Sequence, residues 1–560
     1  MSKRAVILST AVVFCFFVVI ARLAGIMLLD HERLSKRARL QQSLKKDMEV
    51  ARGVIYDRKG RLLAVNIECD SLYCEPRKIS SPADAARTLS LYAGIEYADA
   101  VKALSSDKGF AWLKRKLDPV AAERIKGLEM DGIGFRPELK RVYPKAMLGS
   151  HVVGAVGVDN QPLEAVELSY DEELRRPGGA VVVFRDAGGR RLSDGTDTYI
   201  KGNDIVLTID EALQFFVEAA LDDAVTKWRP SHATAVVMDP YTGEILALVN
   251  RPAFDPNRPS AYAVSERRNR AITDLFEPGS TFKLVMAAAA LEEGIVNPQT
   301  RFDCSKGSIK AGKWVIHDDH RQGVLTFTEV IQMSSNVGSV MTGFKLGPER
   351  LRRYAARLGF GEPTGIDLPG EAKGRISTGR SEADTAVLSI GYGVAVNAVQ
   401  VLRAYSAVAN GGVLVTPHVV SEVRTPEGDT VFSFKPETVR RAISERTAGI
   451  LKEILISVTD GAGTAPMAAV DGNRVAGKTG TAKMHSPEGY SGDKYASTFV
   501  GFVPADNPKL AIIVVLYEPK GAHYGGTVSA PVFREIAEKS LAYLNVPRED
   551  LFTFAAAGGN

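Results

Sequence analysis

The first apolar stretch of the chain runs through residues 5–29, and a single charge, at Arg22, interrupts it. A helix of this length, at about 1.5 Å rise per residue, crosses a hydrocarbon layer of about 30 Å. A cleaved signal peptide has a shorter apolar region and a small-x-small site, which residues 21–24 match poorly. The pattern therefore predicts a transmembrane anchor with a short cytoplasmic tail over residues 1–30, followed by a polar linker over 31–49.

Between residues 50 and 205 the apolar positions change from strand-like to helical spacing. A turn at residues 57–60 separates two β-type runs, of which the second covers residues 62–74. Helical spacing follows over about 82–126, and mixed, glycine-rich sequence fills the rest. The pattern predicts one elongated α+β module over residues 50–205, here called the pedestal, without a convergent nucleophile and base.

Residues 206–545 show the pattern of a second module. An apolar strand at 205–210 leads into a helical stretch at 211–228, and apolar runs paired around tight turns indicate hairpins near both ends. Strands far apart in sequence, with helices between them, predict an antiparallel sheet that helices flank. The hairpin runs are residues 233–239 with 244–250 and 497–503 with 510–517, a last helix covers 530–544, and residues 546–560 form a loose tail.

Composition sets limits on this architecture. With 560 residues, of which 45% are hydrophobic and 24% charged, the chain is long enough for two or more folded domains. Its 70 lysines and arginines nearly balance 66 aspartates and glutamates and form no basic stripe, so nucleic-acid binding gains no support. The predicted fold class is α+β multidomain, with an anchor, a pedestal and a helix-flanked antiparallel sheet.

The cysteines also exclude some classes of protein. The four of them, Cys15, Cys69, Cys74 and Cys304, match neither a zinc-binding frame nor a disulfide-rich module. In a strand, positions 69 and 74 point to opposite faces, so no disulfide between them is expected. The redox compartment of the protein stays open on this ground.

The strongest chemical signal is Ser280-x-x-Lys283, which follows Pro278 and Gly279 and precedes an apolar helical run over 284–292. The Pro-Gly break places the serine at a helix start, and the lysine three residues on shares its face. The helix start offers backbone N–H groups to an oxyanion, and a neutral lysine amine can remove the hydroxyl proton. Taken alone, however, the pattern fits a capping serine beside a surface lysine better.

Two later segments change that balance. Ser334-x-Asn336 follows a helical stretch over 325–333, and Lys-Thr-Gly-Thr at residues 478–481 opens a β-type segment. Each pattern is weak alone, because chance spacing or an exposed edge strand explains it. In the order Ser-x-x-Lys, Ser-x-Asn, Lys-Thr-Gly, the three together are the signature set of penicillin-binding proteins and serine β-lactamases.

On these motifs the sequence resembles the penicillin-binding transpeptidase family from about residue 205 to 545, and its class B subfamily over nearly the full length. Around Ser280 and Ser334 it is most similar to the septal, FtsI-type members, and no segment resembles a glycosyltransferase domain. Residues 161–167 depart from the family, which more often has glycines beside the glutamate there. The other similar segments are residues 52–60, 269–283, 334–338, 391–393, 476–482 and 524–527.

The resemblance implies a peptidoglycan D,D-transpeptidase that attacks the bond between two D-alanines of a stem peptide and passes the acyl group to a neighbouring stem. It implies Ser280 as nucleophile, Lys283 as general base and Ser334 as proton relay. The base needs a pKa well below the usual lysine value of about 10.4, and burial and the cation Lys478 are the expected causes. The remaining assignments are Asn336 as the group that orients Lys283 and the substrate amide, backbone N–H groups of Ser280 and Thr481 as the oxyanion hole, and Thr479, Gly480 and Thr481 as substrate-binding residues.

The implied partners are stem peptides ending in D-Ala-D-Ala, β-lactams that mimic them, a membrane glycosyltransferase and other division proteins, with no cofactor or metal. The substrate lies outside the cytoplasmic membrane. This predicts a single-pass protein with a cytoplasmic N-terminus and an exterior catalytic domain, periplasmic in a Gram-negative cell. Charge counting gives the opposite orientation, since Lys3 and Arg4 precede the anchor and six basic residues follow it within residues 33–46. That rule is weak for large exported domains.

Other functions stay open beside this one. They are an elongation-type class B transpeptidase, a D,D-carboxypeptidase or β-lactamase-like hydrolase, and a noncatalytic cell-wall scaffold. The hydrolases usually lack a long pedestal and an anchor, and a scaffold does not need all three motifs. A metal site is a further hypothesis, because residues 317–320, His-Asp-Asp-His, have ligand side chains near Cys304. Their spacing matches no known frame, and a polar loop explains them equally well.

Overall fold

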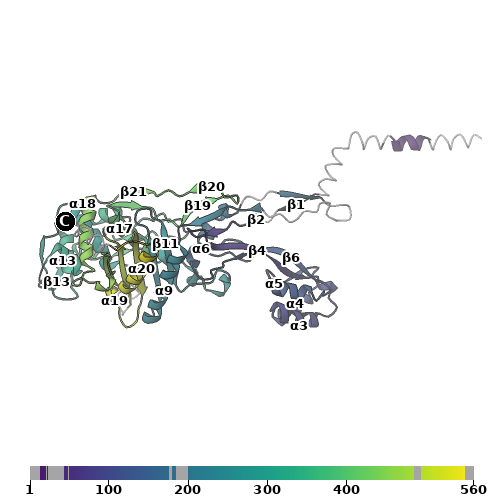
Figure 1. The fold of residues 1–560 in the computed structure, drawn as a ribbon, viewed down its shortest axis with the longest axis horizontal. Helices are drawn as coiled ribbons and strands as arrows, with labels where there is room; N and C mark the ends of the chain where they lie inside the picture. Colours follow the sequence, from purple (N-terminus) through teal and green to yellow (C-terminus); the bar gives the residue numbers. More distant parts are fainter. Residues whose placement is uncertain are drawn as a thin grey trace, which may run out of the picture. The chain divides into compact units, whose positions relative to one another are not determined.

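The computed structural model describes residues 13–20, 22, 43–47, 50–175, 180–184, 200–484 and 494–548. The chain separates into two compact units: Met1–Arg52 with Arg175–Gly202, and Gly53–Leu174 with Asn203–Asn560. Figure 1 shows the elements of each. The second unit contains all the motif residues named above, so its architecture determines how they meet.

The first unit contains a helical segment at residues 13–20 and two small strand pairs. β1 (Ser43–Asp47) pairs antiparallel with β7 (Ala180–Phe184), and β2 (Val50–Ala51) pairs parallel with β8 (Ile200–Lys201). Most of the predicted anchor, residues 5–29, lies outside the described residues. Among the residues that are described, none of the helices combines the length and apolarity needed to span a membrane.

The pedestal hairpin forms where the sequence predicts it. β3 (Ile55–Tyr56) pairs antiparallel with β4 (Leu62–Cys74), which also pairs with β5 (Ala111–Lys114) and β6 (Ile133–Val142). Cys69 and Cys74, both on β4, are buried and free, as expected. The other elements of this region are the turn η2 (Pro76–Lys78) and the helices α3 (Pro82–Ala93), α4 (Tyr97–Leu104) and α5 (Pro119–Lys126). Of these, α4 contacts β5, α5 contacts β4, and α3 packs against both helices.

The predicted helical stretch over residues 82–126 is wrong in part, because it is divided into three helices and strand β5. Gly94, in the left-handed conformation at φ 59°, ends α3. The side chain of Asp118 accepts hydrogen bonds from the backbone N–H groups of residues 120 and 121 and starts α5. Capping residues inside an otherwise helical pattern therefore explain the division.

One sheet joins the pedestal to the second module. Its strand order is β20-β19-β9-β3-β4-β5, with β6 beside β4. β9 (Asp204–Leu207) pairs parallel with β3 and antiparallel with β19 (Val420–Arg424), and β20 (Thr430–Ser433) is the edge strand. β9 ends before the predicted residue 210, because Asp210 caps the following helix by accepting a hydrogen bond from Ala212.

The central sheet of the second module has the order β11-β10-β24-β23-β22, and all its pairs are antiparallel. It confirms both predicted hairpins, β10–β11 and β23–β24, and the pairing of β10 with β24 joins these two ends of the module. Every residue of β24 is buried, so helices cover both faces. The strands are β10 (His232–Met238), β11 (Ile245–Arg251), β22 (Ala476–Lys483), β23 (Tyr495–Val503) and β24 (Leu510–Tyr517), and the helices that contact them include α9 (Glu211–Trp228), α17 (Ala398–Ala409) and α20 (Ala530–Tyr543).

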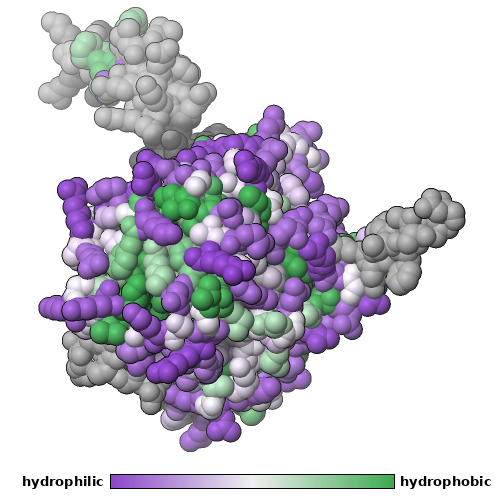
Figure 2. Space-filling view, turned by 90° about the vertical axis from the view of Figure 1, so that its left-hand side faces the viewer, coloured by the Kyte–Doolittle hydropathy of each residue, from purple (hydrophilic) through white to green (hydrophobic). Residues whose placement is uncertain are grey.

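The remaining helices and short strand pairs also belong to the second unit. The face of the molecule in Figure 2 is mainly hydrophilic, with hydrophobic side chains gathered in a few separate areas, as is usual for a folded domain. The helices are α6 (Ser150–Val153), α7 (Ala165–Ser169), α8 (Asp171–Leu174), η3 (Pro259–Ala261), α10 (Val264–Arg267), α11 (Arg270–Thr273), η4 (Gly279–Phe282), α12 (Lys283–Glu292), α13 (Phe327–Gln332), α14 (Asn336–Leu346), α15 (Pro348–Arg357), α16 (Glu382–Ser389), α18 (Glu445–Ser457), η5 (Pro466–Ala468) and α19 (Gly525–Val528). The short strand pairs are β12 (Arg301–Asp303) with β15 (Val324–Thr326), β13 (Ser308–Ala311) with β14 (Trp314–His317), β16 (Arg375–Ile376) with β17 (Val394–Ala395), and β18 (Val413–Val415) with β21 (Thr438–Arg441).

The segment that departs from the family, residues 161–167, contains a strained position. Ala165 has a φ of 53°, in the left-handed region that glycine adopts without cost. Two residues later, Glu167 is completely buried and forms an ion pair with Arg141 at 2.7 Å, while the Tyr143 hydroxyl also donates to it. Arg141 in turn donates to the carbonyl oxygen of Gly53. The buried ion pair thus ties this segment to the start of the pedestal.

We expect Glu167→Ala to lower the free energy of unfolding by about 3–5 kcal/mol, because it leaves the Arg141 guanidinium buried without its carboxylate. Glu538→Ala is the matched control, since it removes an exposed ion pair with Arg534 and should cost about 0.5 kcal/mol or less. Urea unfolding of both variants measures the difference. Equal losses in the two would contradict a structural role for the buried pair.

Candidate active site

Ser280 lies in a short helical turn directly before a buried helix. The turn is η4 (Gly279–Phe282), and α12 (Lys283–Glu292) continues from it, which confirms the predicted helix start. Gly279 adopts a φ of 51°, so the chain turns sharply before the serine. The N-cap of η4 is Pro278, and Ser280 makes no capping hydrogen bond. The alternative of a capping serine beside a surface lysine is therefore wrong, and Lys283 is completely buried.

The amine of Lys283 joins the first two motifs. Its Nζ donates to the carbonyl oxygen of Ser334 at 2.6 Å, to the Ser334 hydroxyl at 3.2 Å and to Asn336 Oδ1 at 2.9 Å. A lysine ammonium has three N–H donors, so these three acceptors match its full capacity. The predicted orientation of Lys283 by Asn336 is present as a direct contact.

The second motif is a strained turn between α13 and α14. Ser334 has a φ of 57°, which is uncommon for a residue other than glycine and is found mainly where a structure enforces it. Ser335 then caps α14, since its hydroxyl accepts a hydrogen bond from the backbone N–H of Gly338. The strained turn places both the hydroxyl of Ser334 and the amide of Asn336 on the same amine.

The third motif lies on β22, one of the two edge strands of the central sheet. Lys478 is completely buried, and its Nζ is 3.2 Å from the Thr479 hydroxyl. The Thr479 hydroxyl also contacts that of Thr464, at 3.1 Å. The hydroxyl of Thr481 accepts a hydrogen bond from the backbone N–H of Gly525.

Glycines let the strand and the serine turn approach each other. A Cβ on Gly480 would lie 2.9 Å from the Thr281 methyl and 3.0 Å from the carbonyl oxygen of Pro278. A Cβ on Gly391 would lie 2.0 Å from the carbonyl oxygen of Gly279. These contacts explain in physical terms the similar segments at residues 391–393 and 476–482.

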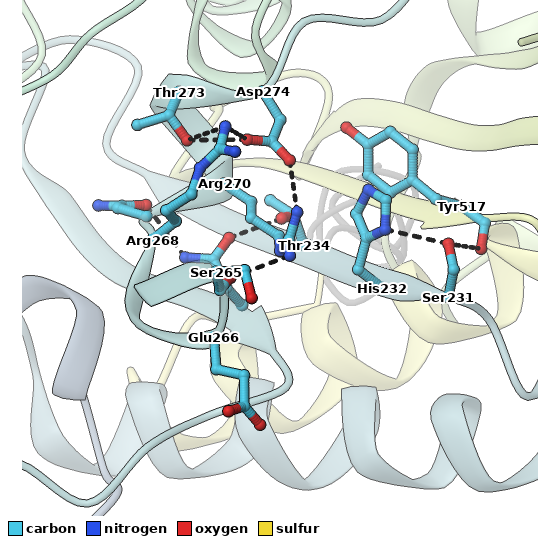
Figure 3. Close-up of polar contacts among 12 residues, drawn as sticks. Ser231, His232, Thr234, Ser265, Glu266, Arg268, Arg270, Thr273, Asp274 and Tyr517 are labelled. Atoms are coloured by element: carbon cyan, nitrogen blue, oxygen red, sulfur yellow. Dashed lines mark hydrogen bonds and ion pairs between the residues drawn. The ribbon is translucent and has the colours of Figure 1, made fainter. Parts of the chain in front are cut away.

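A polar network anchors the chain that leads to Ser280. Asn250 Oδ1, at the end of β11, accepts hydrogen bonds from the Thr234 hydroxyl and the backbone N–H of Ala271, and its amide donates to Asn269. Figure 3 shows the arginines of this segment, Arg268 and Arg270, directed toward Asp274. The segment therefore reaches the serine turn from a fixed position on the sheet.

Two family models match the chain. The penicillin-binding protein dimerisation domain matches residues 47–207, and the penicillin binding protein transpeptidase domain matches residues 233–538. The chain belongs to the penicillin-binding protein family.

Relatives of this penicillin-binding protein match it over most of its length. A probable peptidoglycan D,D-transpeptidase PenA of Neisseria meningitidis is 34% identical and covers 91% of this chain and 87% of its own. Stage V sporulation protein D of Bacillus subtilis is 34% identical, and the match covers 96% of this chain and 85% of that protein. Peptidoglycan D,D-transpeptidase FtsI of Escherichia coli is 32% identical, and the match covers 99% of this chain and 94% of that protein. Penicillin binding protein 3 of Mycobacterium tuberculosis, solved with aztreonam, is 30% identical with a TM-score of 0.70, covering 89% of this chain and 97% of its own.

Burial sets the electrostatics of the site in this penicillin-binding protein. It lowers the pKa of Lys283 from 10.5 to about 7, while the carboxylates of Asp318 and Asp319 oppose the change. The pKa of Lys478 lies well below its usual value, first because of burial and then because of repulsion from Lys283. The sequence predicted burial and Lys478 as the causes for Lys283. Burial is confirmed as the cause for Lys283. The repulsion between the two amines, however, lowers the pKa of Lys478 and not that of Lys283.

Sequence reasoning missed the contacts of Asp318, which it considered as a metal ligand or as part of a polar loop. Its carboxylate accepts hydrogen bonds from the Ser335 hydroxyl at 2.9 Å and from the backbone N–H groups of Asn336 at 2.5 Å and Val337 at 3.0 Å. The carbonyl oxygen of His317 accepts from the Asn336 amide. Within the described ranges, no group of three or more potential ligands is arranged to hold a metal ion. No sequence spacing signals a contact between residues this far apart in the chain.

We expect Gly480→Ala to destabilise the protein by about 1–3 kcal/mol, because the new methyl has no room against backbone atoms of the serine turn. Gly449→Ala is the control: this glycine lies in α18 with nothing within 4 Å of the added Cβ, so alanine should stabilise by about 1 kcal/mol. Thermal unfolding of the two variants gives the sign of each change. A stable Gly480→Ala protein would show that β22 and the serine turn are not in close contact.

Proposed function

We propose that this protein is a membrane-anchored class B penicillin-binding protein that cross-links peptidoglycan stem peptides through a serine acyl-enzyme during septal wall synthesis. The enzyme class, a D,D-transpeptidase, agrees with the family and with relatives of that name. The observation that carries the chemistry is the position of Lys283. Its buried amine lies one helical turn after Ser280 and contacts both polar groups of the second motif.

In the first step, Ser280 Oγ attacks the carbonyl carbon between the two D-alanines. The neutral amine of Lys283 takes the hydroxyl proton as the C–O bond forms. The C–N bond then breaks, and the released D-alanine amine takes a proton from the Lys283 ammonium through the Ser334 hydroxyl. This path is supported by the 3.2 Å contact between Lys283 Nζ and Ser334 Oγ.

In the second step, the amine of a neighbouring stem attacks the ester carbonyl and loses a proton to Lys283 through the Ser334 hydroxyl. The ester C–O bond then breaks, and Ser280 Oγ takes that proton back from the Lys283 ammonium, which restores the free serine. Backbone N–H groups of Ser280 and Thr481 form the oxyanion hole for both steps, where one donor is typically worth about 3–4 kcal/mol. The Thr481 hydroxyl accepts from Gly525, which leaves its own proton to donate to the substrate carboxylate. Thr479 supplies a second hydroxyl beside the Lys478 amine.

The proposed location rests on the apolar stretch at residues 5–29. It would hold the protein in the cytoplasmic membrane with its N-terminus inside and its second unit outside, where peptidoglycan is assembled. A membrane glycosyltransferase and other division proteins are the partners this location calls for. The pedestal is the part proposed to bind them, because its sequence shows no convergent nucleophile and base.

The purified protein should form a covalent adduct with penicillin at Ser280, because the β-lactam amide mimics the D-Ala-D-Ala bond. Ser280→Ala should abolish the adduct while the protein stays folded, since the hydroxyl makes no capping bond. Lys283→Arg should be nearly as damaging, because a guanidinium keeps its proton and cannot act as base. Intact-protein mass spectrometry measures the occupancy.

The outcome against this mechanism is specific. An adduct on Ser280→Ala at wild-type occupancy would remove Ser280 as the nucleophile. A folded wild-type protein without any adduct would contradict the proposed function itself.

Acylation should depend on pH through Lys283. Its amine acts as base only when neutral, and burial lowers its pKa to about 7, so the rate should rise with pH and level off above 7. Below that pH the rate should fall about tenfold per unit, because the neutral fraction falls by that factor. Stopped-flow acylation with a chromogenic β-lactam between pH 5 and 9 gives the profile. A rate that keeps rising toward pH 10 would mean that Lys283 has an ordinary pKa.

The septal role is the part of the proposal that cells test best. In a rod-shaped host, depletion of the protein should give filaments with blocked septa, because growth along the cell continues without cross-linking at the division site. Microscopy after depletion scores the shape. Rounding into spheres would instead assign the protein to wall elongation.

A further inference from the structure

Asp318 lies at the end of the short hairpin β13–β14 and faces the start of α14. Its carboxylate accepts three hydrogen bonds there, from the Ser335 hydroxyl and from the backbone N–H groups of Asn336 and Val337. The first N–H groups of a helix have no partner within the helix, so a carboxylate at this point satisfies them and favours the dipole of α14. The carboxylate comes from a separate loop, not from the chain that precedes the helix.

The same loop also fixes the side chain of Asn336. The Asn336 amide nitrogen donates to the carbonyl oxygen of His317 at 2.9 Å, and its Oδ1 is therefore turned to accept from Lys283 Nζ, also at 2.9 Å. A chain of contacts thus leads from the hairpin through the first turn of α14 to the amine that Ser280 uses.

We propose that Asp318 is a positioning residue for acyl transfer: its carboxylate holds the first turn of α14, and with it Asn336, against the amine of Lys283. This inference rests on the proposed function of the site. Asp318 does not touch the reacting atoms. It acts through Asn336 and Ser335, and its effect on the reaction is to keep the base in one orientation before the substrate binds.

The charge of Asp318 has a second effect on the same amine. The charged groups that face Lys283 are Asp318 and Asp319 from the loop after β14 and Lys478 from β22. Both carboxylates raise the pKa of Lys283, against the larger effect of burial. Loss of either carboxylate therefore lowers the pKa of Lys283 further. The acid limb of the acylation profile, which is the range below the plateau where the rate falls with pH, then moves to lower pH.

Asp319 provides a matched control within the same loop. It is exposed, and among the described residues no hydrogen bond joins its carboxylate to the Ser334-x-Asn336 turn, yet its charge acts on Lys283 in the same direction. Asp319→Asn thus removes a charge without removing the contacts to α14. Ser335→Ala does the reverse, because it removes a contact of Asp318 and the cap of α14 and leaves both charges in place.

The experiment measures penicillin acylation of the full-length protein from pH 5 to 9 for the wild type and the variants Asp318→Asn, Asp319→Asn and Ser335→Ala, with thermal unfolding of each. For Asp318→Asn we expect a plateau rate lower by about tenfold to a hundredfold, the size of effect that loss of an orienting partner has on a metal-ligating side chain, and an acid limb at lower pH. Asp319→Asn should move the limb and keep the plateau, and Ser335→Ala should lower the plateau and keep the limb.

The results separate this proposal from the function on which it rests. No adduct on the wild type would contradict both. A wild-type adduct together with an unchanged Asp318→Asn rate would contradict the positioning role alone. The same conclusion would follow if Asp318→Asn lost rate only in proportion to its unfolded fraction and its acid limb stayed at the wild-type pH. If Asp318→Asn does not fold, a wild-type plateau in Ser335→Ala overturns the proposal, and a lowered plateau with an unchanged limb supports it.

Discussion

The buried amine of Lys283 is the constraint on which the rest of the site depends. A lysine without exposure to water is tolerable only if its donors have acceptors or its charge is lost. Here the acceptors come from the Ser334 turn, and burial brings the pKa to about 7. The same burial that makes the lysine costly to the fold also lowers its pKa toward neutrality, which supports its proposed role as a base. A second buried amine, Lys478, adds a repulsion that only close packing can maintain.

That packing explains why so many glycines surround the serine turn. Gly480 lets β22 pass beside Pro278, and Gly391 lets another loop approach Gly279. The central sheet then fixes β22 through its pairing with β23, and Asn250 fixes the chain before the turn. Three segments far apart in sequence are thus held around one amine by backbone contacts, with backbone strain at Ser334 and a left-handed turn at Gly279 that glycine adopts without strain.

Much of this arrangement could be predicted from the sequence. The hairpins around residues 240 and 506 and the helices α9 and α20 follow from apolar spacing and turn residues, and the motifs were sufficient to predict the contact between Lys283 and Asn336. What could not be predicted has a physical reason. Asp118 and Gly94 end helices inside a helical pattern, and the contacts of Asp318 join residues that no periodicity relates. The pKa values of Lys283 and Lys478 likewise depend on how deeply the fold buries each amine, which the sequence does not show.

The central claim is that burial lowers the pKa of Lys283 to about 7, so that its neutral amine can act as a base near neutral pH. Its most direct test is an NMR titration of the protein with carbon-13-labelled lysine side chains, with Lys283→Arg used to assign the resonance. The account predicts a Lys283 signal that titrates near pH 7. A signal that titrates near the ordinary value of 10.5 would contradict it.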